Sequence, residues 1–134
     1  MVVLDTNIII DHLRQAHGKP TILERMLHMY PKDPLMLSVV SVQELYEGKS
    51  TLDTTKESML LATITPLNIL PYTFEVAEWA GKIARDFLHP IEFADAAIAA
   101  TAIIQGGKLL TLNQKHFMGI PELEIVKIWK DNCY

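Results

Sequence analysis

A short apolar strand followed at once by a helix is predicted from VVLDTNIIIDHLRQ, residues 2–15. Val2–Leu4 is a wholly apolar run, as expected of a buried strand. A helical pattern then runs from Thr6 to Gln15 and stops at His17-Gly18. A buried strand that passes directly into a helix, with Asp5 at the junction, is the repeating unit of a parallel α/β sheet.

The same alternation continues outward along the chain. Further strands are expected over 35–39, 67–70, 108–112 and 123–128, and helices over 20–30, 41–48, 53–63, 73–88 and 94–105. The helix 94–105 is apolar on nearly every face, which indicates burial. This order predicts an α/β fold, a three-layer α/β/α sandwich with a mainly parallel sheet. Without a linker or repeat, residues 1–134 are expected to form a single domain.

The composition favours a globular protein and argues against disordered, disulfide-linked and membrane-spanning proteins. A hydrophobic fraction of 49% with 21% charged residues is enough to build a core. The net charge of −4 is unusual for a non-specific nucleic-acid binder, but an acidic metal site in a nuclease would itself lower the charge. Cys133 is the single cysteine, so no intrachain disulfide forms. With neither a signal segment nor a membrane-length apolar run, we expect a cytoplasmic protein without membrane association.

Four polar residues stand at the predicted carboxyl ends of strands or at the start of the buried helix: Asp5, Glu44, Asp95 and Asn113. Parallel strands end along one edge of a sheet, where ligands of α/β proteins bind. Carboxylates brought together there would repel one another unless a cation lay between them. Oxygen ligands without histidine or cysteine favour Mg²⁺ or Mn²⁺ over zinc.

Each of these residues also fits a purely local role. Asp5 or Thr6 would cap the first helix, and Glu44 completes a possible capping box with Ser41. Asp95 would complement the dipole of its helix, and Asn113 would begin a turn. The joint placement at one edge favours the metal-site hypothesis over four unrelated caps.

The residues around these positions resemble a known family. In sequence order and across nearly the whole chain, they are similar to the PIN-domain proteins, and more narrowly to the VapC-type toxins of prokaryotic toxin–antitoxin pairs. The matching segments are VLDTNIIIDH (3–12), LSVVSVQELYEG (37–48), ADAAIAATA (94–102) and LLTLNQKHF (109–117).

The resemblance implies a metal-dependent endoribonuclease that hydrolyses RNA phosphodiesters. Asp5, Glu44 and Asp95 would hold one or two Mg²⁺ or Mn²⁺ ions and Asn113 would join them in the catalytic set, although many relatives carry an aspartate there. Auxiliary roles fall to Thr6, Asn7 and Thr111. The ions would activate a water and stabilise the charge that develops on the phosphate.

The same resemblance implies an antitoxin protein and a homodimer. The helices carry apolar side chains that would be available for such contacts, namely Met26, Leu27, Met59 and Leu60. An antitoxin segment is expected to bind the remaining apolar surface as a helix in a groove.

Several other residues have two interpretations. Arg14 and Lys49 either contact RNA phosphates or are solvated helix ends, and Glu47 is either an outer acid of the site or a surface residue. Of the five histidines, His116 alone lies near the predicted site, with a minor role at best. Trp79 and Trp129 are expected in the core or at an interface.

Three alternative functions remain open at this point. The chain could be a PIN nuclease for RNA processing without an antitoxin, or a catalytically inactive PIN-like binding scaffold. A phospho-receiver domain is disfavoured, because it needs an acidic pair after the first strand and a lysine after the last core strand. Here Asp5 is followed by Thr-Asn, and Lys108 stands at the start of its strand.

Overall fold

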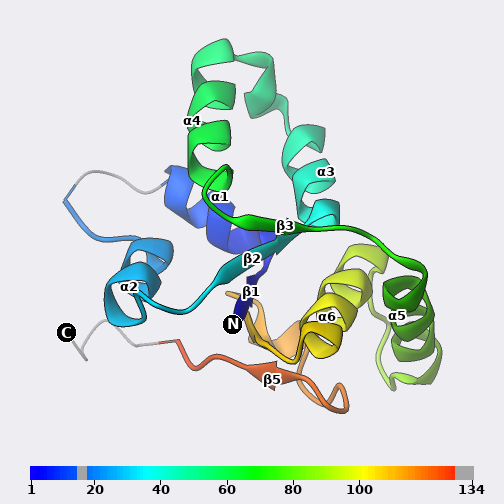
Figure 1. Cartoon of the computed structure of the whole chain (residues 1–134). Helices are drawn as coiled ribbons and strands as arrows, with labels where there is room; N and C mark the ends of the chain where they lie inside the picture. Colours follow the sequence, from blue (N-terminus) through cyan, green and yellow to red (C-terminus); the bar gives the residue numbers. More distant parts are fainter. Residues whose placement is uncertain (15–17, 129–134) are drawn as a thin grey trace.

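The fold is taken from a computed structural model, in which residues 1–14 and 18–128 are described. Five parallel strands form one sheet in the order β3-β2-β1-β4-β5 (Figure 1). The strands are β1 (Val2–Leu4), β2 (Leu35–Ser38), β3 (Asn68–Leu70), β4 (Lys108–Leu110) and β5 (Glu124–Ile125). The expected helix end at Gln15, with His17, Trp129 and Cys133, lies outside the described residues.

Helices connect the strands and cover both faces of the sheet. They are α1 (Thr6–Arg14), α2 (Ile22–Met29), α3 (Val39–Glu47), α4 (Thr54–Ile64), α5 (Phe74–Asp86) and α6 (Phe93–Gln105), with short 3₁₀ helices η1 (Lys49–Leu52) and η2 (Gln114–His116). The strand and helix positions confirm the predicted α/β order, and the two 3₁₀ helices were not expected.

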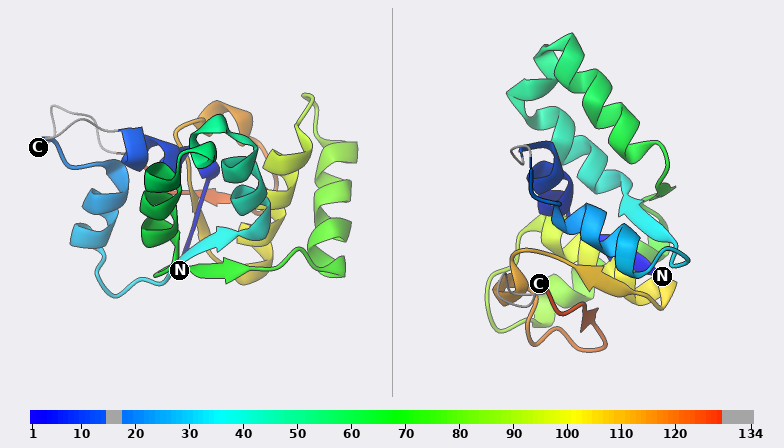
Figure 2. Two further views of the ribbon diagram at one scale, coloured as in Figure 1. Left: turned by 90° about the horizontal axis from the view of Figure 1, so that it is seen from above. Right: turned by 90° about the vertical axis from the view of Figure 1, so that its left-hand side faces the viewer.

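Two apolar cores lie on opposite faces of the sheet, as the alternation of side chains along β1 requires. Leu4 faces the first core, which α1, α2 and α4 cover. Val3 faces the second core, which contains α5 and α6. Figure 2 shows these layers from two further directions. The predicted three-layer sandwich is confirmed, and the sheet is parallel throughout.

The second core is built around α6. Its residues from Ala96 to Ala102 are all buried, which confirms the burial predicted from its apolar composition. The helix ends at Gly106, whose left-handed backbone (φ 67°) suits glycine. Because α6 begins at the carboxyl edge of the sheet and is fixed on all sides, it can hold a polar side chain in its first turn at a defined position.

Several predicted boundaries were wrong by a few residues, for identifiable reasons. The second helix begins at Ile22 and not at Pro20, because Thr21 forms a capping box with Glu24. The third begins at Val39 and not at Ser41, because Ser38 ends β2 and accepts a hydrogen bond from the backbone N–H of Val40. Strands β4 and β5 are also shorter than expected.

The apolar residues proposed for interfaces divide into two groups. Met26 and Leu60 are buried in the first core, so the expectation that they are exposed was wrong. Leu27 and Met59 are about half exposed. Their positions within α2 and α4 explain the difference, since one face of each amphipathic helix must turn to the sheet. No helix in the described part of the chain is both long and apolar enough to span a membrane.

Candidate active site

Asp5 is fixed at the carboxyl end of the central strand. The register aligns Leu4 of β1 with Leu110 of β4, so Asp5 and Thr111 leave the sheet side by side. The Thr111 hydroxyl donates to Asp5 Oδ2 at 2.7 Å, and the backbone N–H of Thr6 donates to Asp5 Oδ1 at 2.7 Å. Asp5 is only 5% exposed. Burial raises the pKa of Asp5, against the lowering effect of these hydrogen bonds and of the nearby His116.

Thr111 is itself held by the residues around it. Its hydroxyl oxygen accepts hydrogen bonds from the backbone N–H of Asn113 (3.0 Å) and from Asn7 Nδ2 (3.4 Å). Asn7 also accepts from the backbone N–H of Leu112 at 3.3 Å. Because its acceptors are used by Asn7 and Asn113, the single hydroxyl proton of Thr111 is directed to Asp5. Asn7 and Thr111 therefore hold Asp5 in place, which fits the auxiliary role expected of them.

Glu44 reaches the same edge from α3. Its Oε1 accepts a 2.6 Å hydrogen bond from the Thr6 hydroxyl, which also lies 2.8 Å from Ser41 Oγ. Ser41 is completely buried one turn before Glu44, on the same face of α3. The capping-box interpretation of Ser41 and Glu44 is therefore wrong, since both lie inside the helix. Ser41 is a neighbour of Glu44 in the site through Thr6. Its position three residues before Glu44, on the same helix face, was the sequence feature that could have indicated this role.

Asp95 lies in the first turn of α6, with its side chain 19% exposed. Burial and then the neighbouring carboxylate of Asp5 raise the pKa of Asp95 to about 6. Glu92 and Glu44 add to this increase, whereas His116 opposes it. Asp95 is thus close enough to both Asp5 and Glu44 for their charges to raise its pKa, although the three acids come from distant parts of the chain.

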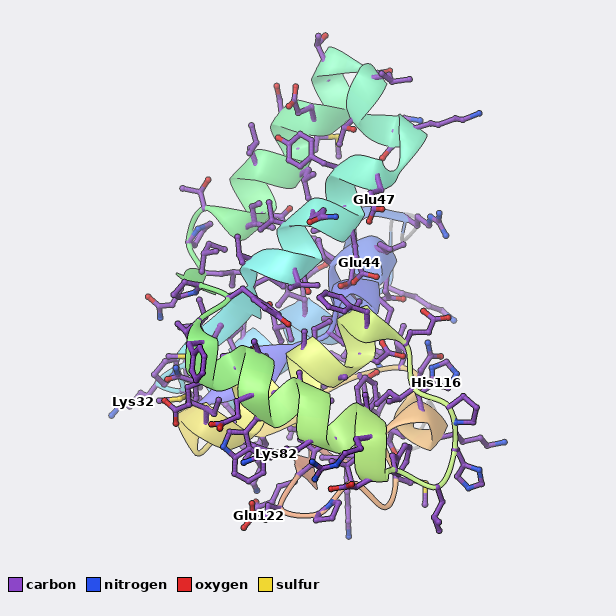
Figure 3. All side chains as sticks on the ribbon, turned by 90° about the vertical axis from the view of Figure 1, so that its right-hand side faces the viewer. Lys32, Glu44, Glu47, Lys82, His116 and Glu122 are labelled. Atoms are coloured by element: carbon purple, nitrogen blue, oxygen red, sulfur yellow. The ribbon has the colours of Figure 1, made fainter. Side chains whose placement is uncertain are left out.

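His116 is closer to the site than the sequence indicated. Its Nδ1 lies 3.5 Å from Asp95 Oδ2, and its side chain is 59% exposed. Figure 3 shows His116 and Glu44 on the same side of the molecule, on η2 and α3. A solvent-facing imidazole beside a carboxylate can offer a positive charge or a hydrogen bond to an anionic ligand.

The remaining predicted residues lie at the margin of the site. Asn113 follows Thr111 at the expected edge, but its side chain is exposed and its polar contacts are made by its backbone. Glu47 is exposed at the end of α3 (Figure 3), and Lys49 is exposed in η1. Arg14 ends α1, where it lines a groove with Glu44.

This arrangement suits a divalent cation by its chemistry. Asp5, Glu44 and Asp95 supply only carboxylate oxygens, which hard cations such as Mg²⁺ and Mn²⁺ prefer. Across residues 1–14 and 18–128, no three acidic, imidazole or thiol groups are gathered tightly enough to hold one ion as they stand. Glu44 in particular is directed to Thr6, so joint binding of an ion would require side-chain rotation.

A groove of about 440 Å³ extends away from Glu44 between α1, α3 and α4. Its walls are mostly apolar, with Leu13 from α1, Leu45 from α3 and Met59 from α4. Arg14 and Lys56 add positive charge to its sides. It thus joins the acidic edge to an apolar surface that is large enough for several side chains of a partner.

A second apolar surface lies beside β3 and the start of α6. Tyr72 and Phe93 stack with ring centroids 5.9 Å apart, and together with Val39 they line a shallow depression. Phe93 is 72% exposed, and Phe74, two residues after Tyr72, is 86% exposed. We call Val39, Tyr72 and Phe93, together with the exposed Phe74 that follows closely in the chain, the aromatic face. Large apolar side chains grouped in this way are typical of interaction surfaces.

Comparisons of sequence and of structure with known proteins point to the same family. The model of the PIN domain family matches residues 2–120. Ribonuclease VapC10 of Mycobacterium tuberculosis is 32% identical over 127 residues, which cover 92% of this chain and 91% of the relative.

Among solved structures, the chain resembles that of DNA-bound VapBC from Salmonella typhimurium, with 25% identity and a TM-score of 0.81. The match covers 93% of this chain and 96% of that one. The structure of VapBC-1 from nontypeable Haemophilus influenzae matches with 26% identity and a TM-score of 0.76, over 94% and 96% of the two chains.

Proposed function

The chain belongs to the PIN domain family, and we propose that it is a metal-dependent endoribonuclease, the toxin of a toxin–antitoxin pair. The observation that carries this proposal is the position of Asp5 beside Thr111 and of Glu44 beside Thr6, with both carboxylates close enough to Asp95 to raise its pKa. The relative named as a ribonuclease and the neighbours named VapBC support it. Location in the cytoplasm stays a prediction.

The three carboxylates would hold the divalent cation, Mg²⁺ or Mn²⁺. When bound, such a cation acts as a Lewis acid toward the phosphate and lowers the pKa of water. Burial first and then the neighbouring carboxylates raise the pKa of Asp95, and a cation would offset the part that comes from repulsion between the acids. The all-oxygen donor set thus fits the proposed ion.

The neighbouring residues position the acids. Thr111 and the backbone N–H of Thr6 hold both oxygens of Asp5, so its carboxylate has a fixed orientation. Thr6 and Ser41 orient Glu44 through the hydroxyl chain. His116 faces solvent beside Asp95, where its imidazole can contact a phosphate oxygen of the RNA backbone. We assign Asn113 an outer role, since its side chain is exposed.

The groove between α1, α3 and α4 is the proposed binding site of the antitoxin. Its apolar walls suit the apolar face of a helix. Because Glu44 forms part of the same groove, a bound segment would also cover the acidic edge. Inhibition would then follow from exclusion of RNA.

We assign a second copy of this chain to the aromatic face. Phe74 and Phe93 are too exposed to stabilise the monomer, and burial of such side chains contributes roughly 1.5–3 kcal/mol each. This interface replaces the one expected from Met26 and Leu60, which are core residues.

Expression of the chain in a bacterial host tests the function. Induction should arrest growth with loss of intact RNA, and Glu44→Gln should relieve both effects at equal protein level. Equal arrest by Glu44→Gln would contradict the proposal. A nuclease of RNA processing would leave growth unaffected while cleaving RNA in vitro, and an inactive scaffold would show neither activity.

A further inference from the structure

A separate pocket of about 300 Å³ opens between the end of α5 and the loops 87–89 and 118–121. Trp79 and Ile83 contribute from α5, and Phe87 and Met118 from the two loops. Lys82 lies on the same side of α5 (Figure 3). We call this cavity the α5 pocket. None of the site residues described above lines it.

Both loops of the α5 pocket are connected along the chain to residues of the acidic edge. The segment 118–121 begins two residues after His116, which pairs with Asp95. The segment 87–89 leads into α6, whose first turn carries Asp95. Between His116 and the pocket, Phe117 is buried in the second core and anchors the loop. The two loops that line the pocket are thus continuous in the chain with His116 and with the first turn of α6.

The walls of the pocket present flat and apolar groups to solvent. The rings of Phe87 and His89 lie edge to face, 5.9 Å apart. Leu88 and Met118 are 92% and 63% exposed, although both are large apolar side chains. Gly119 has φ +91°, and a Cβ there would lie 3.7 Å from Phe87 Cε1, an ordinary contact. Glycine is therefore needed here for the backbone conformation of the loop. A side chain at this position would not fill the pocket.

The charges around the pocket favour an anionic ligand. Lys82 lies 3.8 Å from Glu78, with both side chains more than half exposed, and its charge also helps to lower the pKa of Asp86. Such exposed pairs contribute little. The carboxylate of Asp86 is paired with Arg85 at 2.6 Å, so its negative charge is compensated. His89 also lines the pocket, which leaves Lys82 and His89 available toward a phosphate.

We propose that the α5 pocket binds one unpaired base of the RNA substrate, next to the phosphate that is cleaved. The inference rests on the proposed function. Unpaired bases are recognised by stacking on aromatic side chains, with basic groups following the backbone. The pocket volume is at the lower end of ligand sites, which suits a single base. Trp79, Phe87 and His89 supply the rings, and Lys82 supplies the positive charge.

Binding of a short single-stranded RNA and of an abasic strand with the same length and charge tests the proposal. EDTA is present throughout, so that neither strand is cleaved. Trp79 fluorescence reports occupancy in a Trp129→Phe background, which leaves one of the two tryptophans. The strand with bases should bind about tenfold more tightly than the abasic strand, as expected for one stacked base.

Met118→Asp should abolish this preference, because it places a charge at the rim of the pocket. Leu52→Asp is the matched control, since Leu52 is 84% exposed in η1 and is not a pocket residue. It should keep the preference. If Met118→Asp does not fold, Leu88→Asp at the 92% exposed rim position carries the same test.

Equal affinity for both strands in the parent, or an unchanged preference in Met118→Asp, would overturn the proposal. Equal affinity is also the result expected if the pocket binds a protein segment. The proposed function can fail independently of this inference. A chain that never cleaves RNA, but still prefers the strand with bases in a way that depends on Met118, would refute the nuclease activity and support the base-binding pocket.

Discussion

Thr111, at the end of β4, donates a 2.7 Å hydrogen bond to Asp5, at the end of β1. The two residues are 106 positions apart in the chain and are adjacent because β1 and β4 pair in parallel register. The sheet itself thus orients the most buried acid of the site. Both partners are at most 5% exposed, so this bond is protected from water.

Thr111→Val should destabilise the protein by about 1–3 kcal/mol, because it leaves buried partners of the hydroxyl without a hydrogen bond. It should also raise the pKa of Asp5 further, since the bond from Thr111 lowers that pKa. Urea unfolding in EDTA measures the first effect. Thr111→Ser is expected to restore stability in part.

Thr101→Val is the control for this loss. Thr101 is equally buried, but its hydroxyl donates only to the Ala97 carbonyl within α6. Removing such an intrahelical bond leaves no charged group without a partner. A loss of stability in Thr101→Val as large as that in Thr111→Val would show that the contact with Asp5 has no special importance.

Asp95→Asn should raise the metal-free stability near neutral pH and abolish cleavage. The folded-state pKa of about 6 exceeds the ordinary aspartate value of 3.8, so folding favours the protonated acid. The associated stability is present below pH 3.8 and is lost as the pH rises through about 6. A rise of the pKa from 3.8 to about 6 corresponds to about 3 kcal/mol, more than the roughly 0.3–1 kcal/mol of a helix-dipole interaction.

Melting curves in EDTA between pH 4 and 8 measure this effect. The difference between Asp95→Asn and the parent should grow as the pH rises. An earlier melting of Asp95→Asn at pH 7 would mean that the contact of Asp95 with its own helix dominates, and that the acids do not repel one another.

The sequence predicted the fold class, because apolar runs and helical patterns alternate along the whole chain. It also indicated that Asp5, Glu44 and Asp95 lie near one edge of the sheet, and their role as metal ligands stays a prediction. It did not identify the role of Ser41, since a serine before a helical segment is also a typical cap. His116 was undervalued because its partner, Asp95, is brought to it only by the packing of α6. The failure at Met26 has a similar cause: a helix pattern does not say which apolar neighbour faces the sheet.

Asn113→Asp should tighten Mn²⁺ binding several-fold, because it adds a negative charge to a residue whose backbone N–H contacts Thr111, the partner of Asp5. The Asn113 side chain is exposed, so its effect on metal-free stability should stay within about 0.5 kcal/mol. Calorimetric titration with Mn²⁺ measures the affinity. Unchanged affinity would place Asn113 outside the site, as a turn residue.

Tyr72→Glu with Phe74→Glu should convert a dimer into a monomer, because both substitutions put charge on the aromatic face. Sedimentation velocity measures the change in mass. Leu52→Glu, at a similarly exposed position in η1, should leave the dimer intact. A parent chain that is already monomeric at high concentration would contradict this interface.

Metal-dependent cleavage by purified protein tests the central claim most directly. The parent and Asp33→Asn, which removes an exposed acid in the loop before β2, should cleave single-stranded RNA with Mn²⁺ and stop with EDTA. Asp5→Asn should be inactive yet folded, since its amide oxygen can still accept the bond from Thr6. Cleavage by Asp5→Asn at the rate of Asp33→Asn, or cleavage that continues in EDTA, would contradict the proposed site.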